Sequence, residues 1–373
     1  ADSDGRLSGN AVAAAIRAAG PAVAKSAVSP SLKCFKLEAT DDTLVLSGTD
    51  LELGVRAVAP AQVSRDGACF VAADFLANAV KAAPDGDITL DVGKAAELKV
   101  VGAKYKVPVE DGASWPDWSR DQSETATVFR VQAVVLCDLM RKAQVAAAQK
   151  ETETKFLTSG VLIDLKGGTL AAVASDNRRI SVASVRHSSD VTCTAVVPRK
   201  GVSAILSAFG ESGHELLVSV TSGRVKVETD EVQLWSGLMA GRFVPWRDVV
   251  ERAAKKAKAV RAEFEPANLL GAVRRAALTG DDNDSAILWR FADGKLHLSL
   301  TGRAGESEVE TEPLSAFETD GEVSLFPNCT TGFLSAAVGA GYSAVVVRTG
   351  GPKEGVLFEC DGWQYLEMPC VKE

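Results

Sequence analysis

The chain carries the same sequence pattern three times, at a constant spacing. Leu44, Leu170 and Leu296 each stand second in a short segment that alternates apolar residues with small or polar ones, and each lies 126 residues from the next. Alternation with a period of two is typical of a half-buried strand. A pattern that recurs at a fixed period indicates one structural unit repeated along the chain, so we expect three similar domains.

Each third also contains two Ala-rich segments, with short alternating runs between them. In the second third, Val131, Val134, Val135 and Leu139 form the apolar stripe of an amphipathic helix. The six expected helices cover residues 8–18, 74–83, 131–148, 199–208, 266–278 and 328–338. Each third is therefore predicted to run helix, strands, helix, strands, which makes the fold class α+β.

Two stretches of biased composition separate the repeats. Residues 119–127 are polar, and residues 253–261 are basic. Linkers between domains commonly have such compositions. We therefore expect domains at 1–122, 123–252 and 253–373.

One uncharged stretch, residues 323–347, is long enough to cross a bilayer. Pro327 and several glycines interrupt it, so we expect a helix, a turn and a strand instead. No membrane partner is expected, and the polar, acidic first ten residues do not resemble a secretory signal. The expected location is the cytoplasm, in association with the nucleoid.

The cysteines and histidines do not indicate a metal site. The chain has 7 Cys and 3 His, all scattered singly, with no paired Cys-x-x-Cys and no cluster at metal-ligand spacing. We interpret the cysteines as small buried hydrophobic residues of a reducing compartment. No cofactor and no metal are expected.

Five short motifs lie in the order and at the spacing of one known family. They are SGTDLE from residue 47, VASDNRRI from 173, VPRKGV from 197, GRF from 241 and YLEMP from 365. With these motifs the whole chain resembles the bacterial DNA polymerase III β sliding clamp family. The resemblance implies three tandem clamp domains, a head-to-tail ring of two copies around double-stranded DNA, and a processivity factor for the polymerase with no active site of its own.

The net charge of −8 on its own argues against a nucleic-acid partner. The six expected helices, however, hold eight basic and two acidic residues, so they carry +6 and the remainder of the chain −14. Basic helices would attract phosphates without reading bases, although solvated helix faces are often basic too. The expected DNA-binding residues are Arg17, Lys25, Arg141, Lys142, Arg199, Lys200, Arg274 and Arg275.

The family's basic channel positions transfer best at Arg199 and Lys200. Ser26 stands where the family has an Arg, with Lys25 beside it. Family basic positions also fall on Ala73 and Asp74, so the resemblance predicts fewer DNA contacts for the first domain.

The resemblance further implies a groove that binds short linear peptides of the polymerase catalytic subunit and the clamp loader. By position, its residues are Thr158, Ser175, Asn177, Arg178, Arg179, Ile180, Val244, Val249, Leu366, Met368, Pro369 and Cys370. The family commonly has Gly-His-Arg where this chain has Asn177-Arg178-Arg179, and the chain also departs from the family's usual residues at positions 158, 244, 248, 367 and 370. Apolar walls remain while the polar rim changes, so the preferred peptide is expected to differ.

The same resemblance places the contact between two copies at Tyr105 and Val107 on one side and at Leu278 and Thr279 on the other. Thr279 replaces an apolar residue, so we expect a weaker interface or one supported by charges such as that of Lys106.

Two other classes of function remain to be weighed. An enzyme would need a catalytic constellation, and the most polar candidates are the turn at Asp176 and the segment at Asp50. Neither has a nearby His, a nucleophile elbow, a phosphate-binding loop or a metal cluster in the sequence, so we interpret Asp176 as a turn cap. The second alternative is a clamp-fold paralogue of a phage, a plasmid or an accessory system, acting as a partner-binding scaffold outside chromosomal replication.

Overall fold

The computed structural model describes residues 6–26, 29–83, 86–92, 95–112, 115–116, 125–149, 156–281, 285–317 and 319–370. The chain forms two compact units. Unit 1 consists of Ala1–Asp138 with Val197–Met239, and unit 2 consists of Leu139–Val196 with Ala240–Glu373. The middle third of the sequence is thus divided between both units, and each unit is described by itself.

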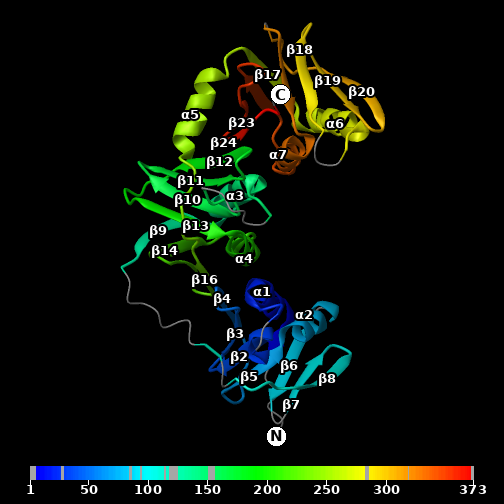
Figure 1. The fold of residues 1–373 in the computed structure, drawn as a ribbon. Helices are drawn as coiled ribbons and strands as arrows, with labels where there is room; N and C mark the ends of the chain where they lie inside the picture. Colours follow the sequence, from blue (N-terminus) through cyan, green and yellow to red (C-terminus); the bar gives the residue numbers. More distant parts are fainter. Residues whose placement is uncertain are drawn as a thin grey trace. The chain divides into compact units, whose positions relative to one another are not determined.

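Unit 1 contains an eight-stranded and a four-stranded antiparallel sheet (Figure 1). The larger sheet has the order β5 (Gly67–Ala72), β2 (Cys34–Thr40), β3 (Thr43–Thr49), β4 (Leu53–Pro60), β16 (Val232–Gly237), β15 (Arg224–Glu228), β14 (Glu215–Val220) and β9 (Thr127–Gln132). The smaller sheet has the order β1 (Arg6–Ser8), β6 (Asp87–Val92), β7 (Ala95–Val100) and β8 (Ala103–Pro108).

Unit 2 repeats this plan. Its larger sheet has the order β13 (Cys193–Pro198), β10 (Gly160–Lys166), β11 (Thr169–Ser175), β12 (Arg179–Arg186), β24 (Trp363–Glu367), β23 (Val356–Cys360), β22 (Val345–Thr349) and β17 (Val260–Phe264). Its smaller sheet has the order β20 (Gly305–Thr311), β19 (Lys295–Gly302), β18 (Ile287–Ala292) and β21 (Gly321–Leu325).

The threefold repeat of the sequence is present in the strands. Leu44, Leu170 and Leu296 are the second residues of β3, β11 and β19, and all three are buried. Each of these strands is the third member of a four-stranded set that joins neighbours in the same order: β5-β2-β3-β4, β13-β10-β11-β12 and β21-β18-β19-β20. The three second halves, β1-β6-β7-β8, β9-β14-β15-β16 and β17-β22-β23-β24, share one order as well.

All six expected helices are present, with shifted ends. They are α1 (Gly9–Ala19), α2 (Ala73–Ala82), α3 (Ala133–Ala143), α4 (Arg199–Phe209), α6 (Pro266–Ala276) and α7 (Pro327–Gly339). The prediction of one helix over 131–148 was wrong at both ends. Val131 lies in β9, where it is paired with Leu216, and α3 gives way to a 3-10 turn at Gln144–Ala146.

A seventh helix, α5 (Trp246–Lys256), was missed. Its last turn includes the start of the basic stretch that we interpreted as a linker. Only Val250 of this helix is fully buried, so the apolar pattern that identifies a helix is almost absent. Its ends are tied to the sheet instead: Arg247 pairs with Asp164, and Arg348 donates to the carbonyl of Ala254 at 2.9 Å.

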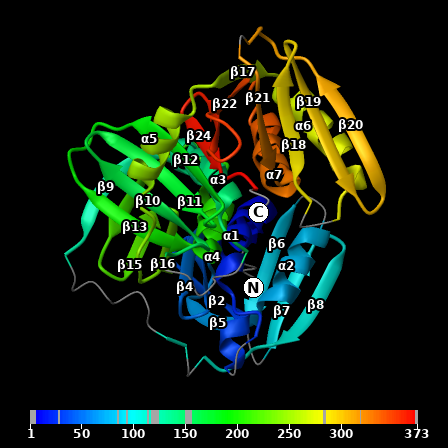
Figure 2. The same ribbon diagram turned by 45° about the horizontal axis from the view of Figure 1, so that its top comes forward.

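The helices cover sheet faces within each unit. In unit 2, α6 packs against β19 and β20. In unit 1, α2 lies over the β6–β8 sheet (Figure 2), where the Phe75 and Tyr105 rings meet edge to face at 5.6 Å. The uncharged stretch 323–347 folds as the end of β21, α7 and the start of β22, as predicted. In the part of the chain that the structure describes, no helix has the length and apolar character needed to cross a membrane.

None of the seven cysteines lies in a disulfide, and five of them are buried. Burial raises the pKa of the Cys34, Cys69, Cys193 and Cys329 thiols to about 11. These side chains therefore stay protonated and act as small apolar residues, as the sequence indicated.

Candidate nucleic-acid and peptide interfaces

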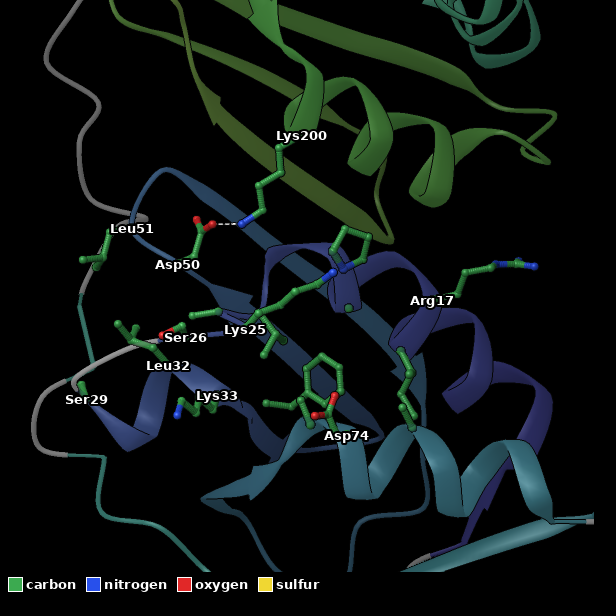
Figure 3. A pocket seen from close by; sticks show the side chains of 18 residues that line it. Arg17, Lys25, Ser26, Ser29, Leu32, Lys33, Asp50, Leu51, Asp74 and Lys200 are labelled. Atoms are coloured by element: carbon green, nitrogen blue, oxygen red, sulfur yellow. Dashed lines mark hydrogen bonds and ion pairs between the residues drawn. The ribbon is translucent and has the colours of Figure 1, made fainter. Parts of the chain in front are cut away.

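Basic side chains from separate segments of unit 1 surround one cavity of about 1340 Å³ (Figure 3). Arg17 comes from α1, Lys25 follows the turn after α1, and Lys200 is the second residue of α4. Buried apolar residues such as Leu32 and Phe35 also line it. The cavity brings together three of the eight expected DNA-binding residues and adds Lys33, which the sequence analysis missed.

An ion pair with Asp50 holds Lys200 at this cavity. Asp50 lies in the turn between β3 and β4, and its Oδ1 accepts the backbone N–H groups of Glu52 at 3.1 Å and Leu53 at 2.8 Å. Its Oδ2 accepts a hydrogen bond from Lys200 Nζ. Partial burial lowers the pKa of Lys200, and the positive charge of Lys25 lowers it further, which indicates that the two ammonium groups converge.

Arg17 joins α1 to α4. Its guanidinium pairs with Glu211 at 2.7 Å, and its carbonyl accepts a hydrogen bond from Ser207 at 2.9 Å. Both charged side chains are well exposed, so the pair adds little stability, and an incoming phosphate could replace Glu211. Arg199, half-buried at the first position of α4, does not line the cavity.

The other four expected DNA-binding residues lie in unit 2, near helix ends. Arg141 and Lys142 are in the last turn of α3, and Arg274 and Arg275 are in the last turn of α6. Lys142 lies over the ring of Tyr342 at 5.1 Å, and Arg274 donates to Ser335 at 3.2 Å. Cations at helix C-termini also compensate the helix dipole, so their position alone does not define a DNA site.

The expected peptide-groove residues fall into two sets within unit 2. In the first set, the turn between β11 and β12 meets the end of β24. Ile180 lies opposite Leu366, Arg179 lies opposite Glu367, and the Met368 N–H donates to the Arg178 carbonyl at 2.8 Å. This contact brings together Ser175, Asn177, Arg178, Arg179, Ile180, Leu366, Met368, Pro369 and Cys370.

The first set combines a buried base with an exposed rim. Ser175, Ile180 and Leu366 are buried, whereas the Met368 side chain is 45% exposed. Asn177 and Arg178 are exposed, and the Arg178 guanidinium lies 5.2 Å from the centre of the Phe326 ring. An exposed apolar side chain beside a cation is suited to bind part of a peptide.

The second set, Thr158, Val244 and Val249, lies around the start of β10 and the beginning of α5. The buried Thr158 accepts the Ala148 N–H at 2.9 Å, and the preceding Leu157 donates to Arg242 at 2.8 Å. Val244 and Val249 are half-buried. Because β10 and β11 are antiparallel, the start of β10 and the end of β11 share one end of the sheet, so this set lies at the same end as Ser175.

Glu367 is the departure with the largest physical consequence. It is 1% exposed, its Oε2 accepts from Thr330 Oγ1 at 2.8 Å, and its Oε1 has no hydrogen-bond partner among the described residues. Burial raises the pKa of this carboxyl to about 8, against the lowering effects of Thr330 and Arg179. Arg179 itself pairs with Asp176 at 2.8 Å.

The two acidic turns that were weighed as catalytic candidates are structural caps. Asp176 Oδ1 accepts the N–H groups of Arg178 and Arg179, each at 3.1 Å, just as Asp50 caps its own turn. The following residues, Asn177 and Leu51, have φ angles of 71° and 81°. The interpretation of Asp176 as a turn cap is confirmed. Among the described residues, no group of three metal-ligating side chains could hold an ion.

The expected contact residues between copies lie on surfaces of both units. Tyr105 and Val107 are half-buried on β8 of unit 1. In unit 2, the Leu278 side chain is 78% exposed, and Thr279 Oγ1 donates to the Leu300 carbonyl at 3.3 Å. Leu278 is a large apolar residue left on the surface.

Solved structures share this fold over nearly the whole chain. The DNA polymerase III beta subunit of Thermotoga maritima has a TM-score of 0.88 at 19% identity and covers 99% of this chain and 100% of its own. The Pseudomonas aeruginosa subunit has a TM-score of 0.86 at 20% identity, with 98% and 99% covered. The architecture is therefore that of a DNA polymerase clamp.

The sequence comparisons identify the family. The N-terminal domain of the DNA polymerase III beta subunit matches residues 6–116, and its central domain matches residues 130–245. The beta sliding clamp of Escherichia coli K12 is 24% identical over 300 residues, 79% of each chain, and that of Chlamydia pneumoniae is 22% identical over 288 residues, 75% of each. The chain belongs to the DNA polymerase III beta subunit family.

Proposed function

We propose that the protein is a sliding clamp whose two copies close into a ring around double-stranded DNA and hold a DNA polymerase on its template. Family membership supports the function. In this proposal residues 1–122, 123–252 and 253–373 are the three domains, the protein acts in the cytoplasm at the nucleoid, and it has no active site of its own.

The observation that carries the ring is the pattern of strand pairing between repeats. The sheet edge β4 pairs with β16, and the equivalent edge β12 pairs with β24. The remaining equivalent edges are β20 and β8, and among the described residues each ends its four-stranded sheet. A second copy can supply each edge with its missing partner, twice, so that two chains close head to tail.

The DNA contacts would come from Lys and Arg side chains on the helices. Arg17, Lys25 and Lys200 line one cavity of unit 1, where the Arg17 side chain points away from the two lysines (Figure 3) and pairs with Glu211. Lys and Arg contacts to phosphates carry no sequence information. Contacts of this kind are independent of sequence and sensitive to salt, which is what a ring that slides requires. In unit 2, the basic residues of α3 and α6 would supply further phosphate contacts.

The peptide contacts would come from the surface around Met368, with Leu366 and Ile180 beneath it and Arg178 at its rim. The proposed ligands are short linear segments of the polymerase catalytic subunit and of the clamp loader. Asn177, Glu367 and Cys370 differ from the family's usual residues, so the preferred peptide should differ from the usual one. Binding should therefore be tested with peptides from this protein's own polymerase and clamp loader.

Retention on DNA tests the proposal. The protein, loaded onto nicked circular DNA by its loader, should stay bound through gel filtration in high salt and leave when a single cut linearises the DNA. Equal retention on circular and linear DNA would contradict sliding. Isolation with a partner protein but with no polymerase or loader subunit would favour the alternative, a paralogous scaffold outside chromosomal replication.

A further inference from the structure

A buried carboxyl group stands next to the rim of the proposed peptide surface. Glu367 is 1% exposed, and the residue that follows it is the exposed Met368. The Glu367 Oε2 accepts a hydrogen bond from the Thr330 hydroxyl at 2.8 Å, whereas its Oε1 has no hydrogen-bond partner among the described residues. An ionised carboxylate is costly to bury without a full set of partners, so this group must stay neutral or receive a cation.

The titratable and charged groups that face Glu367 come from β12 with its turn, from β24 and from α7. Arg179 lies opposite Glu367 on β12, and Asp176 lies in the turn before it. Tyr365 is on β24, Cys329 is in the first turn of α7, and the other neighbouring strand, β23, places an apolar residue opposite Glu367. Burial raises the pKa of the Tyr365 hydroxyl and of the Cys329 thiol, so both keep their protons near neutral pH. Arg179 and Asp176 are therefore the charged groups that act on Glu367.

Arg179 is held by Asp176 rather than by Glu367. The Arg179 Nε donates to Asp176 Oδ2 at 2.8 Å, and its Nη1 donates to the Cys329 carbonyl at 3.4 Å. The Asp176 and Arg179 side chains are only 18% and 17% exposed, so solvent screens their attraction little. Among the described residues, no ion pair joins Arg179 to Glu367, although the two lie directly opposite each other. One arginine is thus within reach of two carboxyl groups and pairs with one of them.

We propose that the protonation of Glu367 controls the shape of the peptide surface, because loss of this proton draws Arg179 from Asp176 to Glu367. The neutral carboxyl needs no cation, so Arg179 then remains with Asp176, as in this structure. The ionised carboxylate would be a buried charge without a counter-ion, and Arg179 can reach it from the opposite position of the strand pair. A charge-assisted hydrogen bond from Arg179 then supplies the missing partner of Oε1.

The exchange of partners reaches the peptide surface through the turn between β11 and β12. Asp176 Oδ1 accepts the N–H of Arg178, whose guanidinium lies 5.2 Å from the centre of the Phe326 ring at the rim. The Arg178 carbonyl accepts the N–H of Met368 at 2.8 Å. The two rim residues, Arg178 and Met368, are therefore neighbours in the chain of the two residues that would pair, so the exchange changes the position of the rim.

A peptide that binds the turn in its present shape should bind more weakly as the pH rises. Burial raises the pKa of Glu367 to about 8, so the protonated form is nearly complete at pH 6.5 and is a minority at pH 9. If only this form binds, the apparent dissociation constant of the peptide rises about tenfold between these two pH values.

This inference rests on the proposed peptide binding and adds its dependence on pH. The test measures the affinity of the full-length wild type and of E367Q for this protein's own polymerase catalytic subunit at pH 6.5 and pH 9. Effects of pH on the polymerase are common to both, so the wild type should lose about tenfold in affinity relative to E367Q. The exposed Glu322, changed to Gln, is the matched control and should keep the wild-type loss. Parallel changes in the wild type and E367Q would overturn this inference alone, whereas no binding of the polymerase at pH 6.5 would overturn the peptide surface itself.

The exchange of partners has its own readout, the NMR signal of the Arg179 Nε–H group in protein that contains isotope-labelled arginine. R179K identifies this signal by its absence. In the wild type the signal should shift with a midpoint near pH 8, as the Nε leaves Asp176, and in E367Q it should stay constant over the same range. A constant signal in the wild type would show that Arg179 remains with Asp176 and would overturn the exchange.

Discussion

Arg179 and Glu367 lie directly opposite each other where β12 pairs with β24, yet each side chain binds a different partner. The Arg179 Nε donates to Asp176 at 2.8 Å, and Glu367 accepts from the Thr330 hydroxyl at 2.8 Å. The buried Glu367 carboxyl therefore has no cation of its own, and burial raises its pKa to about 8.

This raised pKa predicts that the folded protein loses stability as the pH rises. Between the ordinary value of 4.5 and about 8, folded Glu367 holds a proton that the unfolded chain releases, so unfolding becomes easier with increasing pH across that window. E367Q keeps an acceptor for Thr330 and cannot ionise. We expect E367Q to be more stable than the wild type at pH 8.5, by a few kcal/mol, and nearly equal to it at pH 4.5.

Urea unfolding at both pH values measures this difference. The exposed Glu322, changed to Gln, provides the control and should alter neither curve by more than about 0.5 kcal/mol. If the free energies of unfolding of the wild type and E367Q differ by the same amount at pH 4.5 and at pH 8.5, Glu367 does not titrate in this window.

Asp164 is expected to fix the first turn of α5. Its carboxylate is 3% exposed and accepts Trp246 Nε1 at 3.0 Å as well as the Arg247 guanidinium. D164A leaves both donors without this acceptor and should cost about 1–3 kcal/mol. It should also speed hydrogen exchange at the first amides of α5 and weaken peptide binding, because Val244 and Val249 flank this turn.

The control for D164A lies in the same helix. K255A removes an exposed pair with Glu251, at 2.6 Å, and should cost less than about 0.5 kcal/mol. Unchanged exchange at α5 in D164A would mean that packing of Val250, and not the carboxylate, holds the helix.

Lys200 and Asp50 should have opposite effects on DNA binding. K200A removes a phosphate contact, so it should weaken DNA association and reduce the salt slope by roughly one. D50N keeps the oxygen that caps the turn but removes the charge paired with Lys200, so it should strengthen DNA association. Fluorescence anisotropy with duplex DNA over a range of NaCl concentrations measures both, and a weaker D50N complex would exclude competition between Asp50 and phosphate.

The local elements of this fold could be predicted from the sequence, whereas the contacts between repeats could not. The alternation around Leu44, Leu170 and Leu296 located β3, β11 and β19, and the amphipathic segments located six helices. Helix α5 escaped because Val250 is its single buried residue. A strand's alternation fixes which face is buried but does not name its partner, so the pairing of β4 with β16 was not predictable.

The candidate sites follow the same division. The family motifs gave the expected groove residues by position, and the structure brings those at 175–180 and 366–370 together where the β11–β12 turn meets the end of β24. The sequence could not show that Lys200 pairs with Asp50, 150 residues away, or that Lys33 lines the same cavity. Such contacts depend on the pairing between repeats, and no local pattern encodes them.

Leu278 should be essential for the contact between copies and dispensable for the fold. Leu278 lies in the 3-10 turn Ala277–Thr279 after α6. The equivalent turn after α1 packs on α4, and the one after α3 packs on α7. In both cases the partner is the second helix of the next repeat. By this equivalence, the partner that we expect for Leu278 is α2 of a second copy. L278D buries a charge in that contact, so the dimer should dissociate at micromolar concentration while the thermal stability of the monomer stays the same.

L314D is the matched control, because Leu314 is another large apolar residue of unit 2 and is 57% exposed. L314D should remain dimeric. Light scattering separates the two variants, and a dimeric L278D would place the contact elsewhere.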